Sequence, residues 1–342
     1  MSRIRKDDVP QARRTRMDEP STDLDEVPEL SYAGIKTFLK SEHVSPDKLD
    51  EEVDVGVVGV PFDGTVSREP GARHGPEAIR EASSWYAYLG GYKGELLNLA
   101  TDRTVDYGEI DVKDCGDAPT VPTNVEKTRR YVREYVRRVS ESTFPVIIGG
   151  DHYITYPSFM GYATAVDERV GLIHFDAHTD TVDETPLYGK HFHGSPMARI
   201  AESKFGGYEN HAMIGIRGYE SPSFRDLIDD EGLLVKYAQD VREEGIEACV
   251  EEAIEHATDG VERVYLTVDI DSLDPAYAPG TGTPEPGGLT SSDLLRAMDI
   301  LGECDEVGAM DLMEVAPKSD PTDMTSKVGA NIIVRFLESR FL

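Results

Sequence analysis

The sequence predicts an α/β fold in which a mostly parallel sheet is covered by helices on both faces. From residue 53 onward, apolar runs that read as strands alternate with segments of helical periodicity, which is typical of parallel sheets. Clusters of Asp and His directly follow three of these runs, where open α/β sheets bind their ligands. Periodicity alone leaves two arrangements open, a three-layer open sheet and a closed (β/α)₈ barrel.

The strands of the sheet are expected at eight short, apolar runs between charged or turn-forming residues. In chain order these runs are residues 53–60, 104–110, 146–149, 170–175, 212–216, 233–237, 264–269 and 307–312.

A helix is expected over residues 123–140, between the second and third of these runs. Its apolar residues recur at helical spacing and are Val125, Val132, Val136 and Val139. Its water-facing side carries Glu126, Arg129, Arg130 and Arg137. The apolar stripe is therefore expected to cover one face of the sheet.

The N-terminal segment differs from the rest of the chain. Residues 1–29 are charged, contain Pro10 and Pro20, and show little apolar periodicity. We expect a flexible arm of residues 1–30, followed by a single catalytic domain over residues 31–342 without internal repeats.

The charge of the chain excludes several classes of partner. With 35 Lys and Arg against 65 Asp and Glu, the formal net charge is −30, so neither nucleic acid nor an anionic membrane is an expected partner. Carboxylates spread along the whole chain resemble proteins of a salt-rich cytoplasm, where charge repulsion is screened. An acidic, soluble protein from an ordinary cytoplasm is the alternative.

Cysteine usage and hydropathy indicate a cytoplasmic location. Cys115, Cys249 and Cys304 are odd in number and lie outside every motif, which fits a reducing cytosol. No secretory signal is recognisable, and no stretch approaches the roughly 20 apolar residues of a membrane span.

Six residues at three strand ends have the chemistry of a two-metal site. They are His152, Asp176, His178, Asp180, Asp269 and Asp271. Because side chains two apart on an extended chain share a face, the ligands within each cluster can converge on one point. Four carboxylates balance two divalent cations, and carboxylate mixed with imidazole suits Mn²⁺. The plainer alternative is that each Asp only caps a following helix.

The chain resembles the ureohydrolase family, which includes arginase, agmatinase and related hydrolases of guanidino compounds. The matching segments are GVPFD at 59–63, PGARHGP at 70–76, GGDHYIT at 149–155, DAHTD at 176–180, DIDSLDPAYAPGTGTP at 269–284 and MEVAP at 313–317. The resemblance runs from about residue 32 to the C-terminus and favours the open, three-layer form of the sheet. One departure is Tyr153, where the family usually has Ser, and this affects the shape of the pocket rather than the ligand set.

The resemblance implies a role for each site residue. It assigns His152 and Asp180 to one Mn²⁺, His178 and Asp271 to the other, and Asp176 and Asp269 to a bridging position; Ni²⁺ is the alternative metal. It also implies that His193 shuttles a proton, that Glu314 binds the guanidinium, and that Thr283 lines the same pocket. Taken alone, Glu314 reads as a solvated loop residue, and His191 competes with His193 for the site.

The expected reaction is hydrolysis of a guanidino compound to urea and an amine, with agmatine as the first choice of substrate. The loop before His193 lacks the Ser/Asn-rich segment of arginases, and its Asp183 and Glu184 could receive the ammonium of agmatine. Hydrolysis of a guanidino acid, such as 4-guanidinobutyrate or 3-guanidinopropionate, would instead use one of three cations, Lys190, Arg68 or Arg73.

Three further alternatives remain open. Free guanidine is a possible substrate if Tyr153 or Trp85 narrows the pocket. Another binuclear hydrolase, such as a phosphoesterase, would need basic groups, whereas the pocket segments offer Glu285 and Glu314. A non-catalytic relative is the third. By resemblance, the chain is also expected to form a homo-oligomer, a trimer or hexamer.

Overall fold

A nine-stranded sheet in which all paired strands are parallel forms the centre of the molecule. The computed structural model describes residues 30–342, so the expected arm of residues 1–30 lies outside the described residues apart from Leu30. Across the sheet the strands are β1 (Glu42–His43), β5 (Val112–Asp117), β2 (Val55–Gly59), β6 (Phe144–Ile148), β11 (Val307–Met313), β10 (Val264–Asp269), β7 (Gly171–Phe175), β8 (His211–Ile216) and β9 (Leu234–Tyr237). Since β1 and β9 are separate edges, the sheet is open rather than a barrel.

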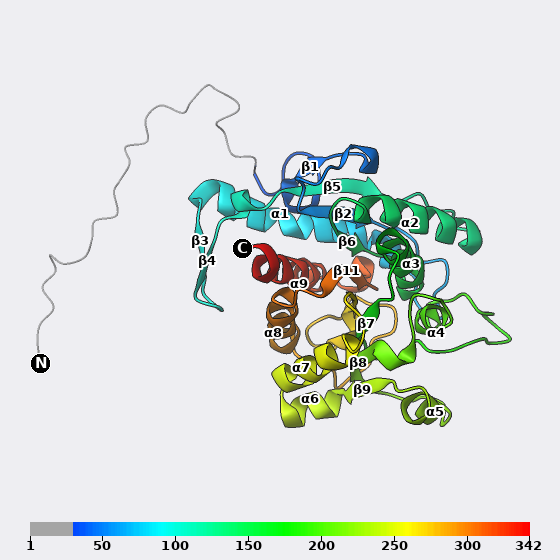
Figure 1. Ribbon diagram of the computed structural model, residues 1–342. Coiled ribbons are helices and arrows are strands. Elements are labelled where there is room, and N and C mark those ends of the chain that lie inside the picture. The colour runs from blue at the N-terminus through cyan, green and yellow to red at the C-terminus, as the bar shows by residue number, and fades with distance from the viewer. Residues whose placement is uncertain (1–29) are drawn as a thin grey trace, which may run out of the picture.

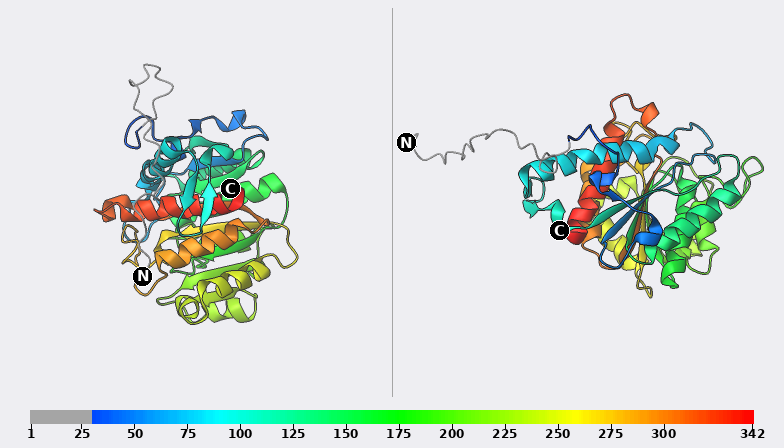
Figure 2. Two further views of the ribbon diagram at one scale, coloured as in Figure 1. Left: turned by 90° about the vertical axis from the view of Figure 1, so that its left-hand side faces the viewer. Right: turned by 90° about the horizontal axis from the view of Figure 1, so that it is seen from above.

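Helices cover both faces of the sheet, which gives three layers (Figures 1 and 2). One face packs against α1 (Gly75–Lys93), α6 (Ala238–Glu244), α7 (Ile246–Ala257), α8 (Ser291–Gly302) and α9 (Met324–Phe341). The other packs against α2 (Val125–Ser140), α3 (Thr155–Val166), α4 (Pro196–Ala201) and α5 (Phe224–Asp229). Alternation along β6 shows why both faces are buried: Val146 and Ile148 enter one core, and Ile147 enters the other.

The expected helix over residues 123–140 is confirmed as α2. Asn124 caps it by accepting a hydrogen bond from the amide of Lys127 at 2.9 Å. Val132, Val136 and Val139 are fully buried, while Val125 is only partly buried. The helix therefore contacts the sheet with the face that the periodicity predicted.

The expected strand over residues 104–110 is wrong. Arg103–Val105 forms β4, which pairs antiparallel with β3 (Leu96–Asn98) outside the main sheet, and Tyr107–Glu109 is a 3₁₀ turn. The Asp106 side chain stops the strand by accepting the Gly108 amide at 2.9 Å. The sheet strand at this point is β5, which follows this turn.

The polar sequence of β5 explains why periodicity missed it. Its Asp114 is buried in the sheet because the Arg80 guanidinium of α1 binds it through two nitrogens, at 2.8 and 2.9 Å. The buried carboxylate in β5 thus depends on an arginine from α1, which the sequence of β5 itself does not reveal. β1, only two residues long, also escaped prediction. In residues 30–342, no helix is long and apolar enough to cross a membrane.

Candidate metal centre

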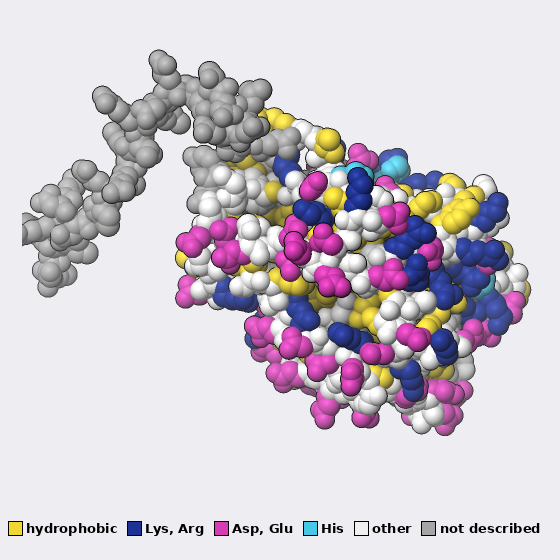
Figure 3. Space-filling view, turned by 45° about the horizontal axis from the view of Figure 1, so that its top comes forward, with side chains coloured by type: hydrophobic (Ala, Val, Ile, Leu, Met, Phe, Trp, Pro, Cys, Tyr) yellow, Lys and Arg dark blue, Asp and Glu magenta, His cyan; other side chains and the backbone are white. Residues whose placement is uncertain are grey.

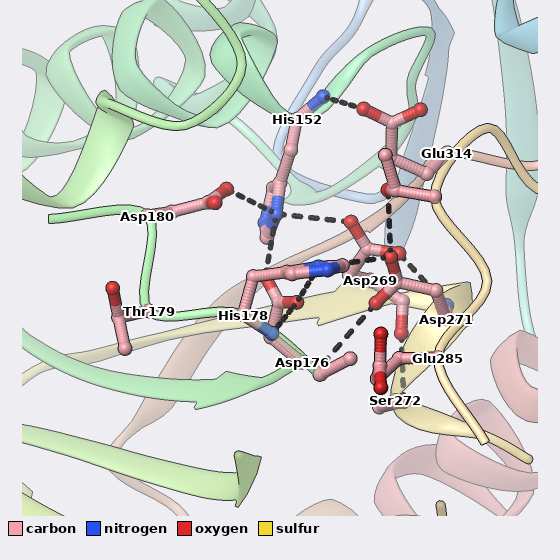
Figure 4. Close-up of polar contacts among 12 residues, drawn as sticks. His152, Asp176, His178, Thr179, Asp180, Asp269, Asp271, Ser272, Glu285 and Glu314 are labelled. Atoms are coloured by element: carbon pink, nitrogen blue, oxygen red, sulfur yellow. Dashed lines mark hydrogen bonds and ion pairs between the residues drawn. The ribbon is translucent and has the colours of Figure 1, made fainter. Parts of the chain in front are cut away.

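Four neighbouring strands deliver the candidate site residues to one edge of the sheet. β6, β11, β10 and β7 are adjacent in the sheet, and all four run in the same direction. Their carboxyl ends are followed by His152, Glu314, Asp271 and His178, so these side chains meet in space although they are far apart in sequence (Figure 4). All six expected metal ligands lie in this group.

The first set of ligand atoms surrounds the Nδ1 atom of His152. Carboxylate oxygens of Asp176, Asp180 and Asp269 lie 2.9, 3.0 and 3.1 Å from it. His152, Asp176 and Asp269 are almost completely buried, and Asp180 is 9% exposed. Four donor atoms therefore face one small region that is shielded from water.

The orientation of His152 fits a cation at this point. Its Nε2 atom lies 3.0 Å from the Thr267 hydroxyl, which leaves Nδ1 to face the carboxylates. That Nδ1 atom is buried and makes no hydrogen bond of acceptable geometry within the described residues. A lone pair and three carboxylates directed at each other repel unless a proton or a metal cation lies between them, and one imidazole with three carboxylates is a donor set that fits a divalent metal.

The second set of ligand atoms involves the other oxygen of Asp176. Nδ1 of His178 lies 3.4 Å from Asp176 Oδ1 and 3.2 Å from Asp271 Oδ2. Asp176 thus faces His152 with one oxygen and His178 with the other, which suits a carboxylate shared by two ions. The side chain of His178 is 39% exposed, so the second position is open toward solvent.

Without a cation, protons have to neutralise this cluster. Burial, together with the neighbouring Asp271 and Asp176 carboxylates, raises the pKa of Asp269 well above its usual range. Burial opposes the charge of His178, but Asp271 and Asp176 outweigh it and raise the pKa of this imidazole to about 12. Divalent ions at the same place would displace these protons.

Glu314 and His193 contact each other beside the candidate metal ligands. Glu314 is 1% exposed, and its Oε1 atom accepts the His152 amide at 2.9 Å and lies 3.0 Å from Nδ1 of His193. Its Oε2 atom accepts no hydrogen bond that the described residues make and lies 3.7 Å from where a Cβ on Gly282 would be. This oxygen is therefore available to a ligand.

Backbone strain also marks two of the site residues. Asp180 and Glu314 have φ angles of 50° and 61°, in the left-handed region that side chains other than glycine rarely adopt. Such strain persists only where the surrounding structure imposes it, and it is frequent at functional sites.

The other expected pocket residues divide into two groups. The Thr283 hydroxyl donates to Asp271 Oδ2 at 3.1 Å, so Thr283 belongs to the site. His191 instead faces the Tyr153 hydroxyl at 2.9 Å, and Tyr153 is 1% exposed. Of the two histidines, only His193 contacts Glu314 among the described residues.

The charged groups expected to hold the far end of a substrate are mostly engaged elsewhere. Asp183 forms ion pairs with Arg199 and with Lys190, the latter at 3.2 Å. Arg73 pairs with the buried Asp63. Arg68 is exposed and has no ion pair with the described residues.

Three supporting residues escaped the sequence analysis. His174 and Thr267 each precede a candidate metal-ligand Asp by two residues and share its face of the strand, a period that could have identified them. Nε2 of His174 lies 2.7 Å from Asp176 Oδ2. Asp151 accepts the amide and hydroxyl of Thr65 at 2.8 and 2.7 Å. Burial, followed by the charge of Glu314, raises the pKa of Asp151 to about 7.

Comparison with known proteins places this geometry in a family. Residues 53–338 match the arginase family. Guanidinopropionase of Pseudomonas aeruginosa is 35% identical over 320 residues, covering 92% of this chain and 94% of that protein. An agmatinase of Chromobacterium violaceum is 36% identical over 306 residues, covering 89% of this chain and 88% of that protein.

A solved structure agrees in fold. Proclavaminate amidinohydrolase of Streptomyces clavuligerus superposes with a TM-score of 0.78 at 30% identity, covering 91% of this chain and 99% of that one. The expected three-layer sheet is thereby confirmed, with nine strands in place of about eight.

Proposed function

This chain belongs to the arginase family and is a ureohydrolase, a hydrolase of linear amidines, and from that premise we propose that it converts agmatine into putrescine and urea. The observation that carries the proposal is the buried Glu314 carboxylate with one free oxygen beside the candidate metal ligands. A guanidinium is planar and permanently charged, and a carboxylate binds it through well-oriented hydrogen bonds.

We propose two Mn²⁺ ions as the cofactors, with Ni²⁺ as the alternative. His152, Asp176, Asp180 and Asp269 would hold one ion, and Asp176, His178, Asp269 and Asp271 the other. When bound, such ions make hydroxide available as a nucleophile at neutral pH. Asp180 would contribute to catalysis as a ligand of the first ion.

Glu314 orients the substrate. Its Oε1 atom is held by the His152 amide, so the free Oε2 atom has a defined position relative to the metal ligands. A guanidinium bound there would present its central carbon to the ligand cluster. Gly282 lies beside this oxygen and allows the Glu69 backbone to approach closely, because a Cβ at position 282 would lie 3.7 Å from Glu314 Oε2 and only 2.7 Å from the Glu69 carbonyl oxygen.

His193 supplies the proton that the departing amine requires. Burial opposes its charge, but the hydrogen bond and charge of Glu314 outweigh it and raise the pKa of the His193 imidazole to about 9. The ring is therefore protonated at neutral pH and can act as a general acid. Binding of a cationic guanidino group at Glu314 would offset the carboxylate charge and favour release of this proton.

Carboxylates around the site support a cationic substrate. The Thr179 hydroxyl, between two metal ligands, donates to Glu220 Oε2 at 2.8 Å. The Arg217 guanidinium donates to the backbone carbonyls of Glu285 and Asp271 at 2.6 and 2.7 Å. Glu285 therefore lies beside the candidate metal ligand Asp271 (Figure 4). We propose that Glu220, Glu285 and the exposed Glu184 attract the distal ammonium in place of the engaged Asp183.

A guanidino acid is the second candidate substrate. Arg68 is exposed, free of ion pairs with the described residues, and directly follows Ser67, whose hydroxyl lies 2.6 Å from Nε2 of His193. A cation there would suit a carboxylate at the far end of a substrate such as 3-guanidinopropionate or 4-guanidinobutyrate. The similarity to guanidinopropionase adds to this candidate.

The test is urea release in high salt, with Mn²⁺ and separately with Ni²⁺. The substrates are agmatine, 3-guanidinopropionate, 4-guanidinobutyrate, arginine and guanidine. We expect the highest kcat/KM for agmatine and a decrease when Glu220 or Glu285 becomes Gln. A clearly higher value for a guanidino acid, lost in Arg68→Ala, would reverse the choice of substrate. Absence of urea from all five compounds with either metal would contradict the reaction itself.

Assembly and location remain predictions. We propose a homo-oligomer, a trimer or hexamer, measurable as the molar mass in solution by light scattering. We also propose that the single catalytic domain works in the cytoplasm, where free thiols such as Cys249 persist.

A further inference from the structure

The loop of residues 62–71 reaches the candidate proton donor from the side opposite Glu314. Ser67 in this loop places its hydroxyl 2.6 Å and its backbone amide 3.0 Å from Nε2 of His193. His193 is therefore held at both ring nitrogens, by Glu314 at Nδ1 and by Ser67 at Nε2. Ser67 is exposed, whereas His193 is only 9% exposed.

The loop that carries Ser67 is fixed at both ends. Thr65 donates its amide and hydroxyl to the buried Asp151, and its carbonyl accepts the His193 amide at 3.2 Å. Further along, the Gly71 amide donates to buried Asp63 at 2.8 Å. A contact between Ser67 and His193 is thus imposed by the fold rather than by a freely moving side chain.

The two donors of Ser67 constrain the proton on the ring. A backbone N–H can only donate, so when the ring is neutral, its Nε2 atom offers the lone pair and its Nδ1 atom carries the proton toward Glu314. A hydroxyl can donate to this lone pair, and it can accept when the ring is protonated at both nitrogens. Ser67 Oγ therefore suits both charge states that a proton donor passes through, whereas the Ser67 backbone N–H favours the ring that has given up its Nε2 proton.

We propose that Ser67 is the positioning residue of His193 and that its hydroxyl is the path by which the ring regains a proton from solvent. In this transfer the Ser67 O–H bond breaks as the bond from Nε2 to hydrogen forms. Hydronium or a buffer acid protonates Oγ at the same time, so the serine is regenerated. The inference rests on the proposed ureohydrolase reaction, in which His193 gives its Nε2 proton to the departing amine. The Nδ1 proton stays on the Glu314 side, so Nε2 is the atom that has to be protonated again.

The test compares Ser67→Ala and Ser67→Thr in the metal-loaded enzyme on the best substrate of the panel. Removal of a general acid typically lowers the rate about 10²–10⁴-fold. Since Ser67→Ala leaves His193 in place and removes only the hydroxyl that reprotonates it, we expect kcat to fall about tenfold. KM and metal content should stay within about twofold, because the residue contacts neither Glu314 nor a metal ligand in the described structure. Ser67→Thr should retain most of the rate, and added imidazole buffer should partly restore Ser67→Ala.

A double-mutant cycle separates this role from a structural one. In a His193→Ala background, Ser67→Ala should change kcat by less than about twofold, because a residue that acts through His193 has no effect once the ring is gone. The control is Ser223→Ala, an exposed serine whose hydroxyl contacts that of Ser221 at 2.8 Å.

Two results would overturn the role of Ser67. One is an unchanged kcat in Ser67→Ala; the other is an equal loss with and without His193. If the wild-type protein releases no urea from any compound of the panel, the proposed reaction fails as well. An active wild type with an unaffected Ser67→Ala variant contradicts only this inference.

Discussion

Asp176 belongs to both sets of candidate ligand atoms. Its two oxygens face His152 and His178 separately, and Asp269 faces the same Nδ1 atom of His152. We expect Asp176→Asn or Asp269→Asn to lose at least one metal ion and most activity, because an amide cannot balance two cations. Metal content by elemental analysis and urea release check this together. Full metal occupancy with normal turnover in either variant would contradict the two-metal assignment.

His193 and His191 provide a matched pair of variants in one loop. His193 contacts Glu314, whereas His191 contacts the buried Tyr153. We expect His193→Ala to bind both metals but to turn over about 10²–10⁴-fold more slowly, since general acids contribute on this scale. His191→Ala should have a smaller effect on kcat. The opposite order in the measured kcat values would mean that the proton donor has been misassigned.

At the scale of elements, α9 holds the loop that carries Gly282 and Thr283. The Gly280 amide donates to the Thr325 hydroxyl at 2.8 Å, and Thr325 donates both its amide and hydroxyl to Asp320 at 2.8 Å. Asp320 also accepts the amide and hydroxyl of Thr322. This carboxylate therefore fastens the start of the C-terminal helix to a wall of the site.

The stability of the fold should decrease in acid because of Asp320. Burial opposes its charge, but the hydrogen bonds from Thr322 and Thr325 outweigh it and hold the pKa of Asp320 at about 2. A carboxyl with a lowered folded-state pKa stabilises the fold above its unfolded pKa of about 3.9, and the stabilisation is lost as the pH falls toward 2.

The corresponding variant is Asp320→Asn. We expect it to lower the free energy of unfolding by about 1–3 kcal/mol at pH 7, with a smaller difference near pH 3. Denaturant titration at both pH values measures this, and Asp259→Asn, an exposed substitution, serves as the control. A difference that is equal at the two pH values would argue against the carboxylate as the cause.

The whole molecule carries a formal net charge of −30. Figure 3 shows acidic side chains over much of one face, with basic side chains gathered toward one side. Several arginines are already paired along α2, for example Arg137 with Glu134 at 2.9 Å and Arg130 with Glu126 at 3.0 Å. Many carboxylates therefore lack a cation of their own, because acidic residues outnumber basic ones by 65 to 35.

Stability should rise with salt if the acidic surface reflects a salt-rich cytoplasm. Screening relieves repulsion among carboxylates over the whole surface, whereas it weakens exposed ion pairs that contribute only about 0–1 kcal/mol each. We expect the melting temperature to increase between low and molar KCl. A flat or falling melting temperature would indicate that the local ion pairs outweigh the overall repulsion.

The sequence alone determined the α/β class and the helix α2, and it predicted the six candidate metal ligands that the fold brings together. These follow from local patterns: a buried strand is apolar, an amphipathic helix repeats every 3.6 residues, and parallel strand ends meet at one edge. His174 and Thr267 follow from the same period of two and could have been included. The net charge is also a property of the composition alone.

Only the tertiary structure decided features that depend on distant partners. β5 is a strand because Arg80 neutralises its buried Asp114, and Asp183 forms an ion pair with Arg199, which lies 16 positions further along the chain. Ser67 meets His193 across 126 positions of the sequence. Such contacts leave no local period in the chain, because their energy comes from groups that the fold brings together, and a sequence pattern records only what each segment requires for itself.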